Sequence, residues 1–194
     1  RLWYVPFEYP VEGWSQAADY YDIAGGRVVV RQGPHRVQLL RSCDGRVEWE
    51  SRVAGMRVVQ VRIHDRRVVL MGEGGRRVGV LDLASGAPVF TVDLDNDAPP
   101  LGYEPPVAAG AVWGLNRSAL VGYDLLDGRE RFRQRLLEGF SPTAVFAAGE
   151  DCVVAGGVMG HVMVVDPRSG HVLATSQLPF APLGVRGGVT AGER

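Results

Sequence analysis

The sequence contains no lysine, so all 21 of its basic residues are arginine. It has only two cysteines, Cys43 and Cys152, which are neither adjacent nor part of a CxxC motif. This spacing fits neither a disulfide framework nor a zinc site. No apolar run approaches the roughly 20 residues that a membrane-spanning helix requires. The sequence starts at Arg1 without a signal-peptide pattern, and we expect it to be part of a longer chain.

Other catalytic signatures are also missing. The four histidines show no HxxxH spacing, and there is no Walker loop and no GxSxG motif. The glycines between positions 156 and 160 join two predicted strands with no helix after them, which argues against a phosphate cradle. Alternating aspartates at positions 93, 95 and 97 lack the glycine and closing glutamate of a calcium loop, so we interpret this segment as a linker.

The net charge of −1 gives the chain no overall attraction to nucleic acid or to anionic membranes. The charge is unevenly distributed, because residues 27–77 hold 12 arginines and 5 acidic residues, a local excess of +7. Such a segment could meet an anionic partner, but charges at exposed strand positions also prevent edge-to-edge pairing. Stacking aromatics are not interleaved with the arginines, so nucleic-acid binding is not expected.

The dominant feature that is present is a repeated turn. Aligned on their last residue, the copies end at Gly45, Gly86, Gly128 and Gly170, which are 41, 42 and 42 residues apart. A fixed period of this length indicates one supersecondary unit repeated along the chain. The four turns read Arg41-Ser42-Cys43-Asp44-Gly45, Asp82-Leu83-Ala84-Ser85-Gly86, Asp124-Leu125-Leu126-Asp127-Gly128 and Asp166-Pro167-Arg168-Ser169-Gly170.

Each unit contains four short runs with the alternation or apolar character of β-strands. An aromatic residue lies four positions after the glycine in the first three units, at Trp49, Phe90 and Phe132, and is replaced by Ala174 in the fourth. The predicted units are residues 18–53, 56–93, 105–136 and 142–178, with partial units at 1–10 and 181–194.

Four-stranded units that cannot bury both faces alone are typical of the blades of a β-propeller. The sequence therefore predicts an all-β protein, a β-propeller domain or part of one, built of four-stranded antiparallel blades. The turn aspartate is expected to accept backbone N–H bonds, and the glycine to supply a positive φ. The aromatic residue is expected to pack against the next blade.

The repeat resembles that of the pyrroloquinoline-quinone (PQQ)-like propeller family. Leu81-Asp82-Leu83-Ala84-Ser85-Gly86 and Val165-Asp166-Pro167-Arg168-Ser169-Gly170 are similar to its LDAxTG turn, and Arg46-Val47-Glu48-Trp49-Glu50 to the KxLWE that follows. Arg41 and Ala174 depart from the pattern and are expected to weaken their blades. Members of the family usually close with seven or eight blades, which implies a fragment of a longer propeller; a five-bladed ring and a ring of two copies stay open.

The resemblance implies two functions. One is a non-catalytic scaffold or sensor domain that binds a protein partner or ligand without a cofactor, in the bacterial periplasm or cell envelope. The alternative is a PQQ- and calcium-dependent dehydrogenase of alcohols or sugars, for which no vicinal cysteine pair or calcium-ligand pattern is present. The residues predicted for an interaction surface are aromatic at one end of the chain and basic in the second unit: Trp3, Tyr4, Trp14, Arg62, Arg66, Arg67, Arg76 and Arg77.

Overall fold

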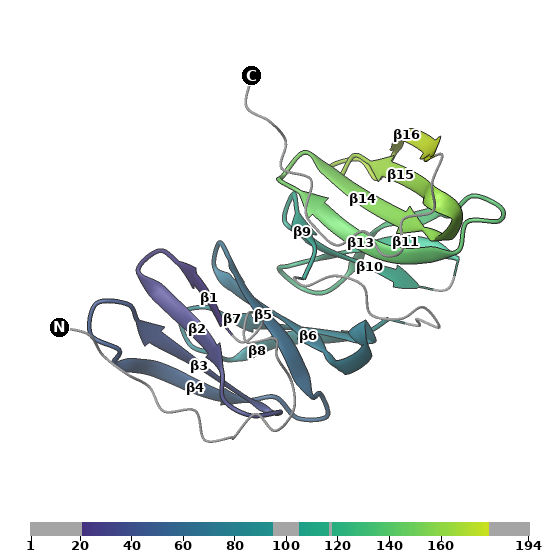
Figure 1. Cartoon of the computed structure of the whole chain (residues 1–194). Coiled ribbons are helices and arrows are strands. Elements are labelled where there is room, and N and C mark those ends of the chain that lie inside the picture. Colours follow the sequence, from purple (N-terminus) through teal and green to yellow (C-terminus); the bar gives the residue numbers. More distant parts are fainter. Residues whose placement is uncertain (1–20, 95–104, 117, 179–194) are drawn as a thin grey trace. The chain divides into compact units, whose positions relative to one another are not determined.

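The computed structural model describes residues 21–94, 105–116 and 118–178 (Figure 1). Trp3, Tyr4, Trp14 and both predicted partial blades lie outside these residues. The chain separates into two compact units. Unit 1 comprises residues 1–93 and 103–105, and unit 2 comprises residues 94–102 and 106–194.

Unit 1 contains two antiparallel sheets, each made of four strands in sequence order. The strands of the first sheet are β1 (Tyr21–Ala24), β2 (Arg27–Arg31), β3 (Arg36–Arg41) and β4 (Val47–Arg52). Those of the second sheet are β5 (Val58–His64), β6 (Arg67–Gly72), β7 (Arg77–Asp82) and β8 (Pro88–Asp93), with a 3-10 turn, η2 (Glu73–Gly75), between β6 and β7.

Unit 2 repeats this arrangement. Its first sheet consists of β9 (Val107–Ala108), β10 (Ala111–Asn116), β11 (Ala119–Asp124) and β12 (Glu130–Arg135). The second consists of β13 (Pro142–Ala148), β14 (Cys152–Gly157), β15 (His161–Val165) and β16 (Val172–Gln177), with η3 (Val158–Gly160) between β14 and β15. The predicted all-β architecture of four-stranded antiparallel blades is confirmed.

Burial differs between strands within a blade. The second and third strands are mostly buried, as in β2, β7 and β10, because apolar side chains cover both of their faces. The fourth strands β4 and β12 alternate exposed and half-buried positions, as expected for an edge that faces solvent on one side. Separate cores form in unit 1, around Val29, Leu39 and Leu70, and in unit 2, around Trp113, Leu120 and Met163.

The four repeated turns share one backbone pattern. In each, the glycine N–H donates to the carbonyl of the residue four positions earlier, as from Gly86 to Asp82 at 2.8 Å, and the N–H of that earlier residue donates across the turn, as from Asp82 to Ala87 at 2.9 Å. The glycine φ is +70° at Gly86 and +74° at Gly170, a region that favours glycine.

Arg41 does not abolish the first turn. Gly45 and Arg41 still make both backbone bonds, and the Arg41 Nε donates to the Asp44 carboxylate at 3.2 Å. Asp44 also accepts the Arg46 N–H at 3.1 Å. The Arg46 N–H and the Arg41 side chain together lower the pKa of Asp44. Asp44 thus accepts the N–H of the residue after the glycine, as Ser85, Asp127 and Ser169 do in the other turns, and it also pairs with Arg41.

Two of the three aromatic residues after the turns, Trp49 and Phe132, pack onto the next blade as predicted. Trp49 lies directly beneath Gly86, where an added Cβ would stand 2.6 Å from the indole ring. Its Nε1–H donates to the Leu83 carbonyl at 2.8 Å. In unit 2 Phe132 lies beneath Gly170, where a Cβ would stand 2.9 Å from the phenyl ring. Only glycine lets the next turn approach an aromatic ring this closely.

Candidate interaction surfaces

The aspartates of the repeated turns stabilise their own turns. Asp82 Oδ1 accepts the N–H groups of Ala84 at 3.1 Å and Ser85 at 3.0 Å, and the Ser85 hydroxyl at 2.9 Å. The Ser85 hydroxyl and backbone lower the pKa of Asp82. In the fourth turn the Ser169 hydroxyl and the Arg168 N–H likewise lower the pKa of Asp166. Such carboxylates are ionised and already hydrogen-bonded, which makes them weak general bases.

Asp124 has the same role in the third blade. Its Oδ1 accepts the Leu126 N–H at 2.7 Å, and Arg131 lies 3.7 Å from its other carboxylate oxygen. The Asp82 carboxylate is also paired with Arg67, at 3.0 Å. The Asp82 and Asp124 carboxylates therefore make their hydrogen bonds and ion pairs within their own blades.

Within residues 21–94, 105–116 and 118–178, no three histidine, cysteine, aspartate or glutamate side chains are placed to hold a metal ion. Cys43 is exposed and Cys152 is partly buried, and both are free thiols. Asn116, the nearest candidate amide for a calcium ligand in the sequence, lies at the end of β10.

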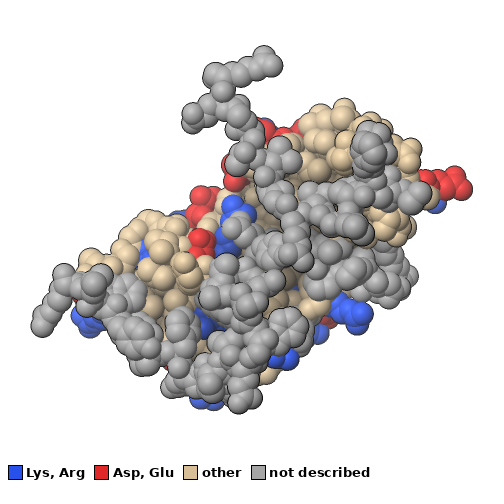
Figure 2. Space-filling view, in the orientation of Figure 1, with Lys and Arg blue, Asp and Glu red and all other residues tan. Residues whose placement is uncertain are grey.

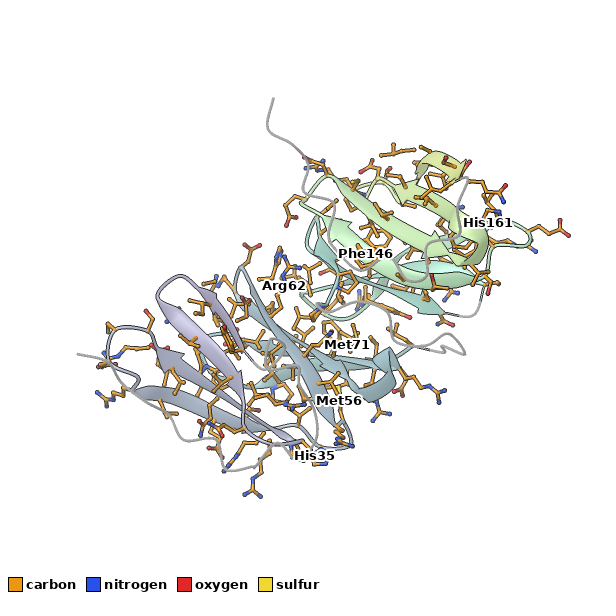
Figure 3. The ribbon with its side chains drawn as sticks, viewed as in Figure 1. His35, Met56, Arg62, Met71, Phe146 and His161 are labelled. Carbon is orange, nitrogen blue, oxygen red and sulfur yellow. The ribbon has the colours of Figure 1, made fainter. Side chains whose placement is uncertain are left out.

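The predicted arginines of the second blade do not form one cluster. Arg66 and Arg67 lie at the β5–β6 turn, whereas Arg76 and Arg77 lie at the opposite ends of the strands, where β6 turns into β7. Arg62 lies within β5 and donates to the Pro105 carbonyl at 3.3 Å. Figure 3 shows Arg62 well separated from His35 and Met56, which mark the end that carries Arg76 and Arg77.

Arg76 and Arg77 share their end of unit 1 with four arginines of the first blade. We name this end the basic rim. It is formed by the β2–β3, β4–β5 and β6–β7 connections, and its basic side chains are Arg31, Arg36, Arg52, Arg57, Arg76 and Arg77 together with His35. Figure 2 shows arginine side chains along the corresponding lower edge of unit 1.

Some rim arginines anchor the loops. Arg31 Nη1 donates to the Val58 carbonyl at 2.8 Å. Arg77 pairs with Asp93 and also donates to the Gly55 carbonyl. The hydrogen bond from Asp93 raises the pKa of Arg77. By contrast, Arg52, Arg57 and Arg76 are exposed.

The opposite end of unit 1 is nearly balanced in charge. Three of its arginines are paired along the turns, Arg27 with Glu48 at 2.9 Å, Arg41 with Asp44, and Arg67 with Asp82, while Arg46 and Arg66 are exposed. Arg31, Arg36, Arg52 and Arg57 were not predicted as surface candidates. The order of the predicted strands could have indicated this surface, because every second connection of an antiparallel sheet lies at the same end of the sheet.

A family model described as "Outer membrane protein assembly factor BamB" matches residues 60–191, more than half of the chain. No curated protein matches the sequence. Within the described residues, no helix is long and apolar enough to cross a membrane.

Several solved structures are similar in fold. They include the computationally designed Ika8 protein (16% identity, TM-score 0.60), a europium-containing methanol dehydrogenase (13%, 0.56) and the quinohemoprotein alcohol dehydrogenase of Comamonas testosteroni (13%, 0.59). The matches cover 80%, 82% and 81% of this chain but only 48%, 41% and 34% of those structures. The chain thus spans half or less of the length of these relatives, and identities this low show the fold alone.

Proposed function

The chain belongs to the family of the outer membrane protein assembly factor BamB, and from this premise we propose that it is a non-catalytic β-propeller scaffold that binds a protein partner. The observation that carries the proposal is the use of the turn carboxylates. Asp82 and Asp166 each accept hydrogen bonds from their own turn, so the acidic groups that the repeat supplies serve architecture. We further propose a location at the cell envelope, in keeping with the family description.

A PQQ- and calcium-dependent dehydrogenase is the alternative function. The likeness to the two dehydrogenase structures supports their fold for this chain and carries no argument for their chemistry. A site of that kind would need calcium ligands from several blades. Among the described residues, the carboxylates are instead distributed over separate turns, and their nearest partners are serine hydroxyls, backbone N–H groups and arginines.

Calorimetric titration of the purified chain with PQQ and calcium separates the two functions. The scaffold proposal expects no heat of binding and no change in Tm. Saturable binding at one site, abolished by a calcium chelator, would overturn the proposal and favour the dehydrogenase.

Photo-crosslinking in cells of the source organism tests for the partner. A photoreactive amino acid placed at one exposed position at a time, on both ends of the blades, is expected to give one protein adduct of defined mass from a contiguous set of positions. The exposed residue Thr175, midway along the outer strand β16, serves as a control outside both ends. Absence of any discrete adduct at all positions would contradict a scaffold function.

A further inference from the structure

We propose that the basic rim of unit 1 binds an acidic segment of a protein partner. The proposal rests on the scaffold function and adds a contact surface and a partner chemistry to it. Its first support is charge. Six arginines of unit 1 gather at this end of the sheets, against three described acidic residues: Glu73 on the β6–β7 connection, Asp93 at the end of β8, and Glu50, which lies 3.7 Å from Arg36. The excess of positive charge is therefore local to the rim.

The second support is the rigidity of the loops that present this charge. Three bonds join the β2–β3 loop to the β4–β5 loop: the Val58 N–H donates to the Pro34 carbonyl at 2.7 Å, the Val53 N–H to the His35 carbonyl at 2.8 Å, and the His35 ring nitrogen lies 2.8 Å from the Met56 carbonyl. Loops tied together in this way lose little conformational entropy when a partner binds.

The β6–β7 connection is held in place by side-chain packing. Gly72, at the end of β6, lies so close to Met56 that an added Cβ would stand 2.8 Å from its Cγ. Figure 3 shows Met56 and Met71 on the same side of unit 1 as His35. The β6–β7 connection, which carries Arg76 and Arg77, is therefore fixed against the loops of the first blade.

The arginines of this rim differ in exposure. Arg31 and Arg77 donate to carbonyls of other loops, and Arg36 donates to the Gln32 carbonyl and lies 3.7 Å from Glu50. Arg52 at the end of β4, Arg57 on the β4–β5 connection and Arg76 on the β6–β7 connection have exposed side chains. Guanidinium groups on such a frame can form bidentate hydrogen bonds with successive carboxylates of one peptide.

The neighbouring side chains favour a protein over other anionic partners. Single-stranded nucleic acid is bound where aromatic side chains stack on successive bases, and membrane surfaces are bound through apolar side chains beside the basic ones. The large exposed apolar side chains described in unit 1 are Tyr21, Ile23 and Val47. Of these, Tyr21 alone pairs with a residue next to the rim, Val30, and one tyrosine forms neither kind of surface.

Fluorescence anisotropy with a labelled peptide rich in glutamate and aspartate tests the proposal. We expect binding that weakens as salt is raised. The triple variant Arg52→Glu, Arg57→Glu and Arg76→Glu should bind at least about tenfold more weakly. The matched control, Arg46→Glu, Arg66→Glu and Arg129→Glu, makes the same change of net charge at exposed positions that are not part of the rim, and should bind within about twofold of the native chain.

Every other outcome counts against the proposal. Equal weakening by the two triple variants would show a response to net charge alone. Tighter binding of an oligothymidine or of phosphatidylglycerol vesicles than of the acidic peptide would replace the proposed partner by nucleic acid or lipid. Absence of peptide binding by a folded chain would remove the rim as a docking surface, and circular dichroism of each variant establishes that it is folded.

The crosslinking experiment distinguishes failure of this inference from failure of the scaffold function. Adducts from positions 52, 57 and 76 would support both. An adduct that forms only from other positions, such as Leu137 on unit 2, would overturn the rim as the contact surface and leave the scaffold function standing.

Discussion

The two units dock their blades at the same position with different aromatic side chains. In unit 1, Trp49 lies beneath Gly86 and also donates a hydrogen bond to the Leu83 carbonyl. In unit 2, Phe132 lies beneath Gly170 without a donor, and instead stacks on Trp113 at 5.7 Å between ring centroids, with Arg131 above its ring. In both units the blades thus dock through an aromatic ring packed against a glycine. The hydrogen bond from the ring to the next blade is made only by Trp49 of unit 1.

The difference extends across the sheets. Trp49 follows a row of paired residues, Val29 and Leu39, across the first blade. The corresponding row of the third blade is Trp113, Gly122 and Phe132. A Cβ on Gly122 would stand 3.2 Å from the Trp113 ring. In the third blade the tryptophan lies on the second strand instead of the outer strand, which carries Phe132. Glycine on the strand between them leaves space for the Trp113 ring.

The largest effect is expected from breaking this row in unit 2. Trp113→Val removes a fully buried indole and should lower the free energy of unfolding by about 3 kcal/mol, because it leaves a cavity. Adding Gly122→Val should recover part of that loss, since the row then matches Val69, Val80 and Phe90 of the second blade. Urea unfolding of the single and double variants measures this. A double variant less stable than Trp113→Val would contradict the account.

Substitutions of two glycines with nearly the same φ distinguish the cost of losing the docking contact from the cost of backbone strain. Gly139 has a φ of +75° and open space around its Cβ position, whereas Gly170, at +74°, faces Phe132. Gly139→Ala should cost about 1 kcal/mol from the left-handed conformation alone. Gly170→Ala should cost at least about 1 kcal/mol more, because the methyl group forces Phe132 to move. Equal losses in urea unfolding would mean that Phe132 does not depend on this close approach.

Trp49→Phe converts the docking contact of unit 1 to that of unit 2. The ring face beneath Gly86 is kept and the hydrogen bond to Leu83 is lost, so stability should fall by about 1 kcal/mol. Trp49→Ala removes both and should cost about 2 kcal/mol or more. If Trp49→Phe and Trp49→Ala were equally destabilised in chemical denaturation, the hydrogen bond rather than the packing would hold the blades together.

The smallest effect concerns pH. The lowered pKa values of Asp82 and Asp166 mean that their turns contribute stability above the ordinary aspartate pKa of about 4, and lose it as the pH falls through the lowered values. Asp82→Asn should therefore make stability less dependent on pH in this acidic range and leave the dependence above about pH 5 unchanged. Thermal unfolding at a series of pH values checks this, with Asp65→Asn as the control at an exposed, neighbouring position.

Much of the fold could be predicted from the turns. The period of the glycines, the apolar runs before them and the aromatic residues after them identified the blades, and Trp49 and Phe132 pack as expected. The contacts of Asp44 with the Arg41 side chain and the Arg46 N–H were not predicted. The predicted basic residues lie within one blade, and it was not predicted that Arg76 lies at the same end of unit 1 as Arg52 and Arg57.

The sequence by itself determined the local structure of this protein, since a turn of five residues and strands of two to seven residues depend on neighbouring residues along the chain. It also determined that Trp49 and Phe132 would dock onto the next blade, because their spacing from the turn glycine is fixed. Only the tertiary structure decided which ends of the strands share a rim and which arginines are exposed there. Those properties depend on contacts between loops distant in sequence, such as that of Met56 with Gly72, which no local pattern encodes.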